Sequence, residues 1–178
     1  RRVLGVIRPT VEAVGALTHT GAVGLVGTPG TVASQSYDIE LAKLHPQIRF
    51  YSHACPMWVP LVENLESEGP GADYFVQRDI AQLMQKAPDI DTLILGCTHY
   101  PLLINKIRQY APQDTNIVLQ GDIVAKSLLD YLRRHPDMYA RITRNGNTEY
   151  ITTEEPDKFS NLAAVFMGKA VKARRENL

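Results

Sequence analysis

The stretch that decides the fold is residues 92–103, which read TLILGCTHYPLL. Residues 92–95 form a short apolar and β-branched run, which is typical of a buried parallel strand. Pro101 stands at a position that favours the first turn of a helix, and Leu102 and Leu103 begin an apolar face beyond it. Cys97 therefore lies where a strand ends and a helix begins.

Cys97 is the first candidate for chemistry. In open α/β folds, ligands bind at the edge where parallel strands end. The start of a helix stabilises a thiolate, so a cysteine there is predicted to be a better base or nucleophile. His99 follows two residues later and can donate or accept a proton. On position alone, a small buried apolar role for Cys97 fits equally well.

Strand and helix patterns alternate along the chain, which predicts an α/β fold with a mostly parallel sheet covered by helices. Residues 1–113 are expected to form one complete α/β domain, and residues 114–178 a partial second α/β domain. The Asn145-Gly146 pair predicts a hairpin turn between residues 139–142 and 148–151. Further strands are predicted by the apolar runs at residues 3–7, 22–26, 48–54 and 117–119.

Composition excludes several classes of protein. A hydrophobic content of 44% is enough for a packed core, which argues against wholesale disorder. Lys plus Arg and Asp plus Glu both number 19, so no overall basic charge indicates a nucleic-acid partner. No apolar run is long enough to predict a membrane span. With only 2 cysteines, the chain is not a disulfide scaffold, and free thiols favour a cytoplasmic location.

The string GCTHYPLL at residues 96–103 closely resembles the second catalytic cysteine motif of the glutamate racemases, in the aspartate/glutamate racemase superfamily. The resemblance continues, in the family's order, at residues 27–31, 54–63 and 150–153. It implies cofactor-independent interconversion of L- and D-glutamate, with two cysteines as the acid/base pair, in the service of peptidoglycan synthesis. It identifies Cys97 as one of those cysteines, His99 as its assistant and Thr98 as a substrate contact, with no metal.

Three further positions match the family's active site. Thr28 and Thr31 surround a second strand-to-helix edge, where hydroxyl and helix N–H groups can bind a carboxylate. From the residues alone, Thr31 is at least as well explained as a helix cap. Glu63 matches an acidic position near the active site, although it could also be an exposed helix charge. The resemblance implies substrate contact for the two threonines and an active-site acid in Glu63.

The family also has features that this sequence lacks. An Asp-Ser-Gly motif and a Cys-Asn-Thr motif, which bears the first catalytic cysteine, precede the matching region in such racemases. The resemblance therefore implies a C-terminal fragment that is inactive alone. Residues 114–178 would return to the truncated domain, and without it we expect that segment to self-associate, as a homo-oligomer, or to be mobile. Many members have an Asp-Ser-Gly-like stretch where this chain has Gln120-Gly121-Asp122, so we assign Asp122 no catalytic role.

The sequence leaves two alternative functions open. A sister racemase acting on aspartate or a hydantoin would share most of these motifs. A zinc- or ligand-binding module is the alternative from another class, because residues two apart on a strand point to one face. Its four ligands would be His53, Cys55, Cys97 and His99. Because the family places the second catalytic thiol elsewhere, we assign Cys55 to the structure.

Overall fold

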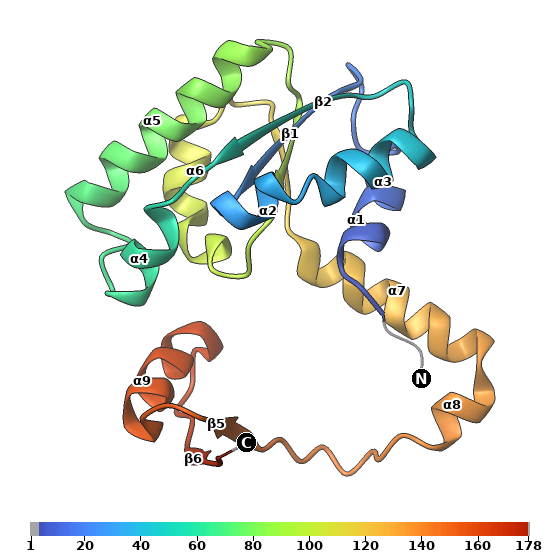
Figure 1. The fold of residues 1–178 in the computed structure, drawn as a ribbon, viewed down its shortest axis with the longest axis vertical. Coiled ribbons are helices and arrows are strands. Elements are labelled where there is room, and N and C mark those ends of the chain that lie inside the picture. The colour runs from blue at the N-terminus through green and yellow to red at the C-terminus, as the bar shows by residue number, and fades with distance from the viewer. Residues whose placement is uncertain (1–3, 178) are drawn as a thin grey trace. The chain divides into compact units, whose positions relative to one another are not determined.

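A central parallel sheet organises the first part of the chain in the computed structural model, which describes residues 4–177. The strands lie in the order β2 (Arg49–Ala54), β1 (Ala22–Gly27), β3 (Thr92–Leu95) and β4 (Asn116–Val118), and every pairing is parallel. Figure 1 shows β1 and β2 side by side between the helices. The helix α1 (Ile7–Val14) precedes the sheet and α7 (Gln120–Arg134) follows it. The connecting helices are α2 (Pro29–Ala33), α3 (Ser36–Leu44), α4 (Trp58–Glu63), α5 (Pro70–Lys86), the 3₁₀ turn η1 (Tyr100–Leu103) and α6 (Ile104–Tyr110). The α/β fold with a parallel sheet covered by helices is confirmed.

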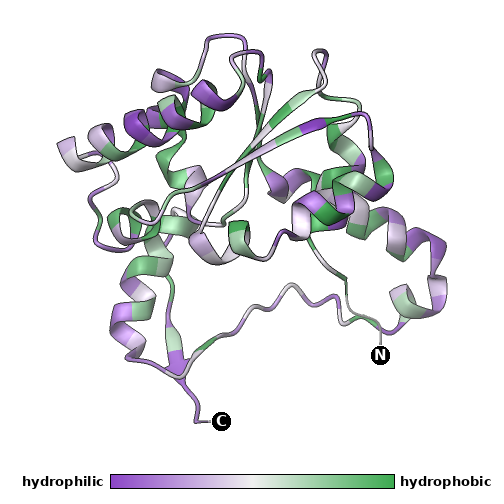
Figure 2. Ribbon diagram, turned by 45° about the horizontal axis from the view of Figure 1, so that its top comes forward, coloured by the Kyte–Doolittle hydropathy of each residue, from purple (hydrophilic) through white to green (hydrophobic). Residues whose placement is uncertain are grey.

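The two central strands, β1 and β3, are buried along their whole length. Successive residues of a strand point to opposite faces. Val23 and Leu25 belong to a core cluster with residues of α1 and α3, whereas Gly24 faces Leu83 of α5. Along the helices, hydrophilic and hydrophobic residues alternate, as expected of elements with one face on the sheet (Figure 2).

The predicted strand at residues 3–7 is wrong for its described part. Residues 4–6 are not in a strand, and Ile7 already begins α1. Pro9 fits the first turn of that helix, and the Thr10 hydroxyl donates to the Val6 carbonyl oxygen at 2.9 Å. Leu4 and Val6 are about half exposed, at 54% and 50%, so the described part of this apolar run is not buried in a sheet. Val3 lies outside the described residues.

The chain divides into two compact units, residues 1–134 and 135–178. The predicted boundary after residue 113 falls inside the first unit, because β4 pairs with β3 and α7 packs against α1. No residue of α7 is buried, and Leu128 and Leu129 are 44% and 45% exposed. A cavity of about 510 Å³ lies between α7 and residues 4–9, away from Cys97. The return of residues 114–178 to another domain stays a prediction.

The second unit is built on a different pairing from the one predicted. It contains α8 (Pro136–Ala140), β5 (Tyr150–Thr152), α9 (Pro156–Met167) and β6 (Ala173–Arg175). The hairpin is wrong, because residues 136–140 form a helix and β5 pairs in parallel with β6. The turn itself forms: Gly146 has a φ of +71°, and the Asn147 N–H donates to the Asn145 side chain. The helix α9 ends before Gly168, whose left-handed conformation is one that glycine adopts without strain.

Asp91 joins the loop before β1 to the start of β3. Its carboxylate accepts hydrogen bonds from the Thr18 hydroxyl at 2.7 Å, the His19 and Thr20 N–H groups at 2.6 and 2.8 Å, and the Thr92 hydroxyl at 2.9 Å. Burial alone would raise the pKa of Asp91, but these hydrogen bonds lower the pKa far below its ordinary value. The ionised carboxylate is therefore part of the folded structure.

We expect Asp91→Ala to lower the free energy of unfolding at pH 7 by about 2–4 kcal/mol, because several charge-assisted hydrogen bonds are lost together. A lowered folded-state pKa gives stability that is present above the unfolded pKa, about 3.9, and is lost as pH falls toward the folded pKa. The difference between wild type and variant should therefore shrink below about pH 4. Urea unfolding at several pH values measures this, with Asp114→Ala, at an exposed aspartate, as the control. Equal effects of the two variants would contradict the role of Asp91.

None of the helices in residues 4–177 combines the length and the apolar character needed to cross a bilayer.

Candidate active site

The predicted site residues gather at the carboxyl edge of the parallel sheet. β1 and β3 pair in register, with Val26 opposite Leu95. The Gly96 N–H donates to the Val26 carbonyl oxygen at 2.8 Å, and the Cys55 N–H donates to the Gly27 carbonyl oxygen at 2.8 Å. The loops that follow β1, β2 and β3 therefore leave the sheet side by side. Thr28 comes directly after β1, and Cys97 stands two residues after β3.

Three predicted residues form a connected chain of polar groups. The Cys97 thiol sulfur lies 3.7 Å from His99 Nδ1, and His99 Nε2 lies 3.1 Å from Glu63 Oε1. Cys97 and His99 come from the turn between β3 and η1, and Glu63 is the last residue of α4. Glu63 is half exposed and His99 is largely covered, with side-chain exposures of 50% and 24%. A thiol, an imidazole and a carboxylate in this order can move a proton from sulfur to nitrogen and stabilise the resulting imidazolium.

The environment of the Cys97 thiol differs from the one predicted. Burial raises the pKa of Cys97 above its ordinary value, although the N–H groups of His99, Tyr100 and Thr98 oppose this change. The negative charge of Glu63 raises the thiol pKa further. The helix start therefore does supply N–H groups toward the sulfur, but desolvation outweighs them. To form a thiolate, a thiol in this environment would need a proton acceptor beside it, and the neighbouring group is His99 Nδ1 at 3.7 Å.

Thr28 and Thr31 are paired with each other. Thr28 caps α2, where its Oγ1 accepts the Thr31 N–H at 3.2 Å, and the two hydroxyl oxygens lie 2.9 Å apart. Both side chains are half-buried, and Thr98 is exposed on the turn beside Cys97. The capping role and a binding role are compatible, because one hydroxyl can cap the helix while the other faces the edge of the sheet.

Tyr100 and Trp58 support the turn that carries Cys97, and the sequence did not single them out for this. The Tyr100 hydroxyl donates to the Cys55 carbonyl oxygen at 3.3 Å, and its ring centroid lies 4.7 Å from that of Trp58. Both side chains are fully buried. The turn after β3 is thereby tied to the loop after β2. The sequence signal for this contact was that each of the two motifs, at residues 54–63 and 96–103, contains an aromatic residue.

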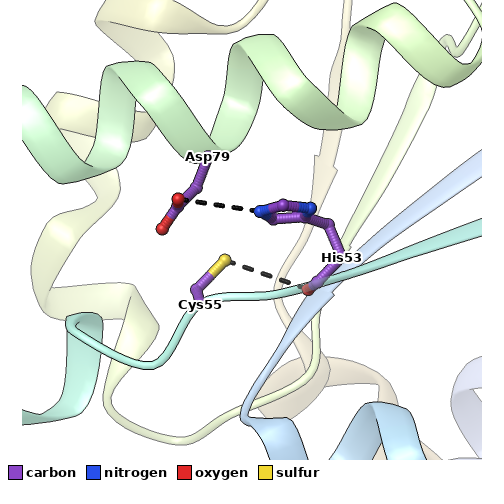
Figure 3. A group of neighbouring side chains, drawn as sticks. All are labelled: His53, Cys55 and Asp79. Atoms are coloured by element: carbon purple, nitrogen blue, oxygen red, sulfur yellow. Dashed lines mark hydrogen bonds and ion pairs between the residues drawn. The ribbon is translucent and has the colours of Figure 1, made fainter.

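The four-ligand zinc site predicted as an alternative does not form. Within residues 4–177, the cluster with metal-ligand geometry is His53, Cys55 and Asp79, whose ligand atoms lie within 4.8 Å of one another (Figure 3). Cys97 and His99 are not part of it. His53 and Cys55 come from β2 and its carboxyl end, and the third member, Asp79, projects from α5 (Figure 3).

The chemistry of this cluster is that of a hydrogen-bonded ion pair. Asp79 is 1% exposed, and its Oδ1 lies 2.7 Å from the Arg78 guanidinium and 3.6 Å from His53 Nε2. Burial alone would raise the pKa of Asp79, but its hydrogen bonds to His53 and Arg78 lower the pKa. Burial, followed by the charge of Asp79, raises the pKa of Cys55 far above its ordinary value. A protonated, buried Cys55 agrees with its assignment to the structure.

Comparison with known proteins gives a consistent result. A family model described as Asp/Glu/Hydantoin racemase matches residues 3–126. The chain is 36% identical over 172 residues to a glutamate racemase of Lactiplantibacillus plantarum, covering 94% of this chain and 60% of that protein. It is 30% identical over 166 residues to a glutamate racemase of Geobacter metallireducens, covering 93% of this chain and 60% of that protein.

Solved structures agree. A glutamate racemase isoform from Bacillus anthracis superposes with a TM-score of 0.87 at 31% identity, covering 99% of this chain and 65% of that one. The glutamate racemase of Francisella tularensis, solved in complex with D-glutamate, gives a TM-score of 0.80 at 25% identity, covering 97% of this chain and 62% of that one. The chain spans about 60% of the length of the two curated relatives.

Proposed function

The chain belongs to the Asp/Glu/Hydantoin racemase family, and we propose that it carries one of the two acid/base cysteines of a glutamate racemase. The observation that carries this proposal is the Cys97–His99–Glu63 arrangement at the carboxyl edge of the sheet. The relatives named above are glutamate racemases, which favours glutamate over aspartate or a hydantoin as the substrate.

The proposed chemistry uses a different group on each face of the substrate Cα. Cys97, as a thiolate, removes the Cα proton from one face, and a second thiol donates a proton from the other face. The Cα–H bond is broken and remade with inverted configuration, and the roles of the thiols are exchanged for the reverse reaction. His99 accepts the thiol proton of Cys97 before this step, and Glu63 stabilises the imidazolium. Because burial raises the pKa of Cys97, the thiol needs such a proton acceptor to become a thiolate near neutral pH.

Thr28, Thr31 and Thr98 are the proposed substrate contacts. Their hydroxyl groups, with the free N–H groups at the start of α2, can bind the carboxylates of an amino acid. Such binding places Cα beside Cys97 and stabilises the negative charge that develops as the proton leaves. The reaction needs no cofactor as electron sink in this scheme. Its proposed biological setting is peptidoglycan synthesis in the bacterial cytoplasm.

Incubation of the natural protein that contains both Cys97 and the second acid/base thiol with L-glutamate in D₂O tests the proposal. We expect the optical rotation to decay to zero while deuterium enters Cα, because the proton delivered to the new face comes from solvent-exchanged thiol. L-Aspartate, incubated in the same way, should keep its rotation for much longer. Racemisation of aspartate instead of glutamate would move the proposal to a sister activity. If neither amino acid exchanges its Cα proton, the racemase proposal is wrong.

A further inference from the structure

His53, Cys55 and Asp79 direct three different kinds of metal-ligand atom into one space. Cys55 and Asp79 are buried, and the His53 side chain is 15% exposed. The three ligand atoms all lie within 4.8 Å of one another, and Figure 3 shows the side chains facing one another between α5 and the end of β2. The cluster shares no residue with the proposed acid/base site. The racemase proposal therefore leaves it without a role.

Asp79 has one carboxylate oxygen that lacks a partner. Its Oδ1 accepts hydrogen bonds from Arg78, with Nε at 2.8 Å and a terminal guanidinium nitrogen at 2.7 Å. The same guanidinium lies over the Phe75 ring, 4.8 Å from its centroid, so Arg78 is held on both sides. Asp79 Oδ2 is buried and has no hydrogen-bond partner within residues 4–177. A buried, unpaired carboxylate oxygen is costly, and a cation bound in the cluster would satisfy it.

The spacing of the cluster is close to that of a tetrahedral metal site. His53 Nε2 lies 3.6 Å from Asp79 Oδ1. With metal–ligand bonds of about 2.0–2.3 Å, two ligands of a tetrahedral zinc ion lie about 3.4–3.6 Å apart. The Cys55 thiol makes only a long hydrogen bond, to the His53 carbonyl oxygen at 3.9 Å. This sulfur is therefore free to rotate toward a bound ion, which closes a gap of about 1 Å at most.

The donor set selects the class of metal. An imidazole nitrogen and a sulfur favour zinc and similar transition metals, whereas magnesium and calcium prefer oxygen ligands alone. Burial raises the pKa of Cys55, so the thiol keeps its proton when no metal is bound. Zinc bound to the sulfur takes the place of that proton, which passes to the solvent. The thiolate and the Asp79 carboxylate then balance the two positive charges of the ion.

We propose that His53, Cys55 and Asp79 form a binding site for one zinc ion, with a water molecule in the fourth position. The partly exposed His53 gives the ion and the water their route of entry. The Cys55 carbonyl oxygen accepts the Tyr100 hydroxyl at 3.3 Å, so bound zinc would also fix the loop on which the turn of Cys97 rests. The site does not depend on racemisation.

Titration with cobalt(II) tests the site directly. Co²⁺ occupies zinc sites, and its bond to a thiolate gives a charge-transfer absorption band that nitrogen and oxygen ligands do not give. The purified, untagged protein is stripped with a chelator, kept reduced and titrated with cobalt chloride. We expect the band to saturate at about one Co²⁺ per chain and to disappear when Zn²⁺ is added, because zinc binds such sites more tightly. Absence of a saturable band would overturn the proposal.

Variants assign the ligands. Cys55→Ala should abolish the band and weaken zinc binding, measured by calorimetry, by at least about 10- to 100-fold, since loss of even an outer-shell partner costs that much. His53→Gln should weaken zinc binding by a similar factor, and it provides the result if circular dichroism shows that Cys55→Ala is unfolded. Zinc affinity that both folded variants retain would contradict the site.

Cys97→Ala is the matched control, because it removes the other of the 2 cysteines. The band and the zinc affinity should both stay at their wild-type values. If Cys97→Ala loses the band and Cys55→Ala keeps it, zinc binds at the catalytic turn and the proposal is wrong. None of these measurements needs turnover, so a failure of the racemase proposal would leave their outcome unchanged.

Discussion

Replacing Cys97 with alanine in the natural protein is expected to lower the rate of glutamate racemisation by about 10⁴-fold, because one face of Cα loses its acid/base group. The loss should be asymmetric at the level of proton exchange. Deuterium should cease to enter the enantiomer whose Cα proton Cys97 removes. Exchange of the other enantiomer should fall less, because the opposite thiol can still remove its proton.

Cys55→Ala is the matched control for this prediction. Both variants replace a CH₂SH side chain with a methyl group, but the Cys55 side chain is 1% exposed and its thiol donates to the His53 carbonyl oxygen of its own strand. We expect the control to retain activity per folded molecule and to lose roughly 1 kcal/mol of stability as a small core truncation. Near-normal racemisation by Cys97→Ala, or loss of turnover in folded Cys55→Ala, would reverse the roles of the two cysteines.

The parts of the fold that could be predicted are those with a strong local signal. Residues 92–95 form the predicted strand β3, and the predicted strand at residues 22–26 lies within β1. In both cases the residues that define the element are adjacent in sequence. Cys97 and His99 were predicted for the same reason, since they share one turn with the strand. Glu63 could be proposed only by resemblance, because its contact with His99 joins residues 36 positions apart.

The misses depend on partners that are distant in sequence. Asp79 lies in the buried stripe of α5 with Val76, Ile80 and Leu83, and a carboxylate at that spacing was an available sign of a buried ion pair. The Asn145-Gly146 turn was correct, but pairing of β5 with β6 joins Tyr150 to Ala173, and no turn signal reports such a contact. The hydrogen bond from the Gln120 side chain to the Tyr37 hydroxyl oxygen joins residues 83 positions apart, so no local sequence pattern could have predicted it.

Trp58→Ala is the second change with a large expected effect, and it acts through packing. Trp58 is completely buried and lies against the Tyr100 ring, with centroids 4.7 Å apart. Truncation should lower the free energy of unfolding by about 3–5 kcal/mol, because it removes a large buried surface and leaves a cavity. Urea unfolding followed by circular dichroism measures this loss.

Trp58→Phe separates packing from hydrogen bonding at the same position. The indole Nε1 is buried and has no hydrogen-bond partner within residues 4–177, so phenylalanine removes an unpaired donor and keeps a ring beside Tyr100. The relief of that donor, about 1–3 kcal/mol, offsets much of the smaller cavity. We therefore expect Trp58→Phe to cost less than half as much as Trp58→Ala. If both variants lost the same unfolding free energy, packing of an aromatic ring beside Tyr100 would not be what stabilises the protein at this position.

The same pair of variants tests the link from the core to Cys97. Tyr100 holds the loop after β2 through the Cys55 carbonyl oxygen, and its ring needs a partner to stay in place. In the alanine variant the turn at residues 97–100 should loosen, so the pH profile of Cys97 alkylation by iodoacetamide should change even at temperatures where the protein is folded. In the phenylalanine variant the turn keeps its aromatic support and the alkylation profile should stay near that of the wild type. An unchanged profile in folded Trp58→Ala would show that the catalytic turn is held by the sheet alone, through Gly96 and Val26.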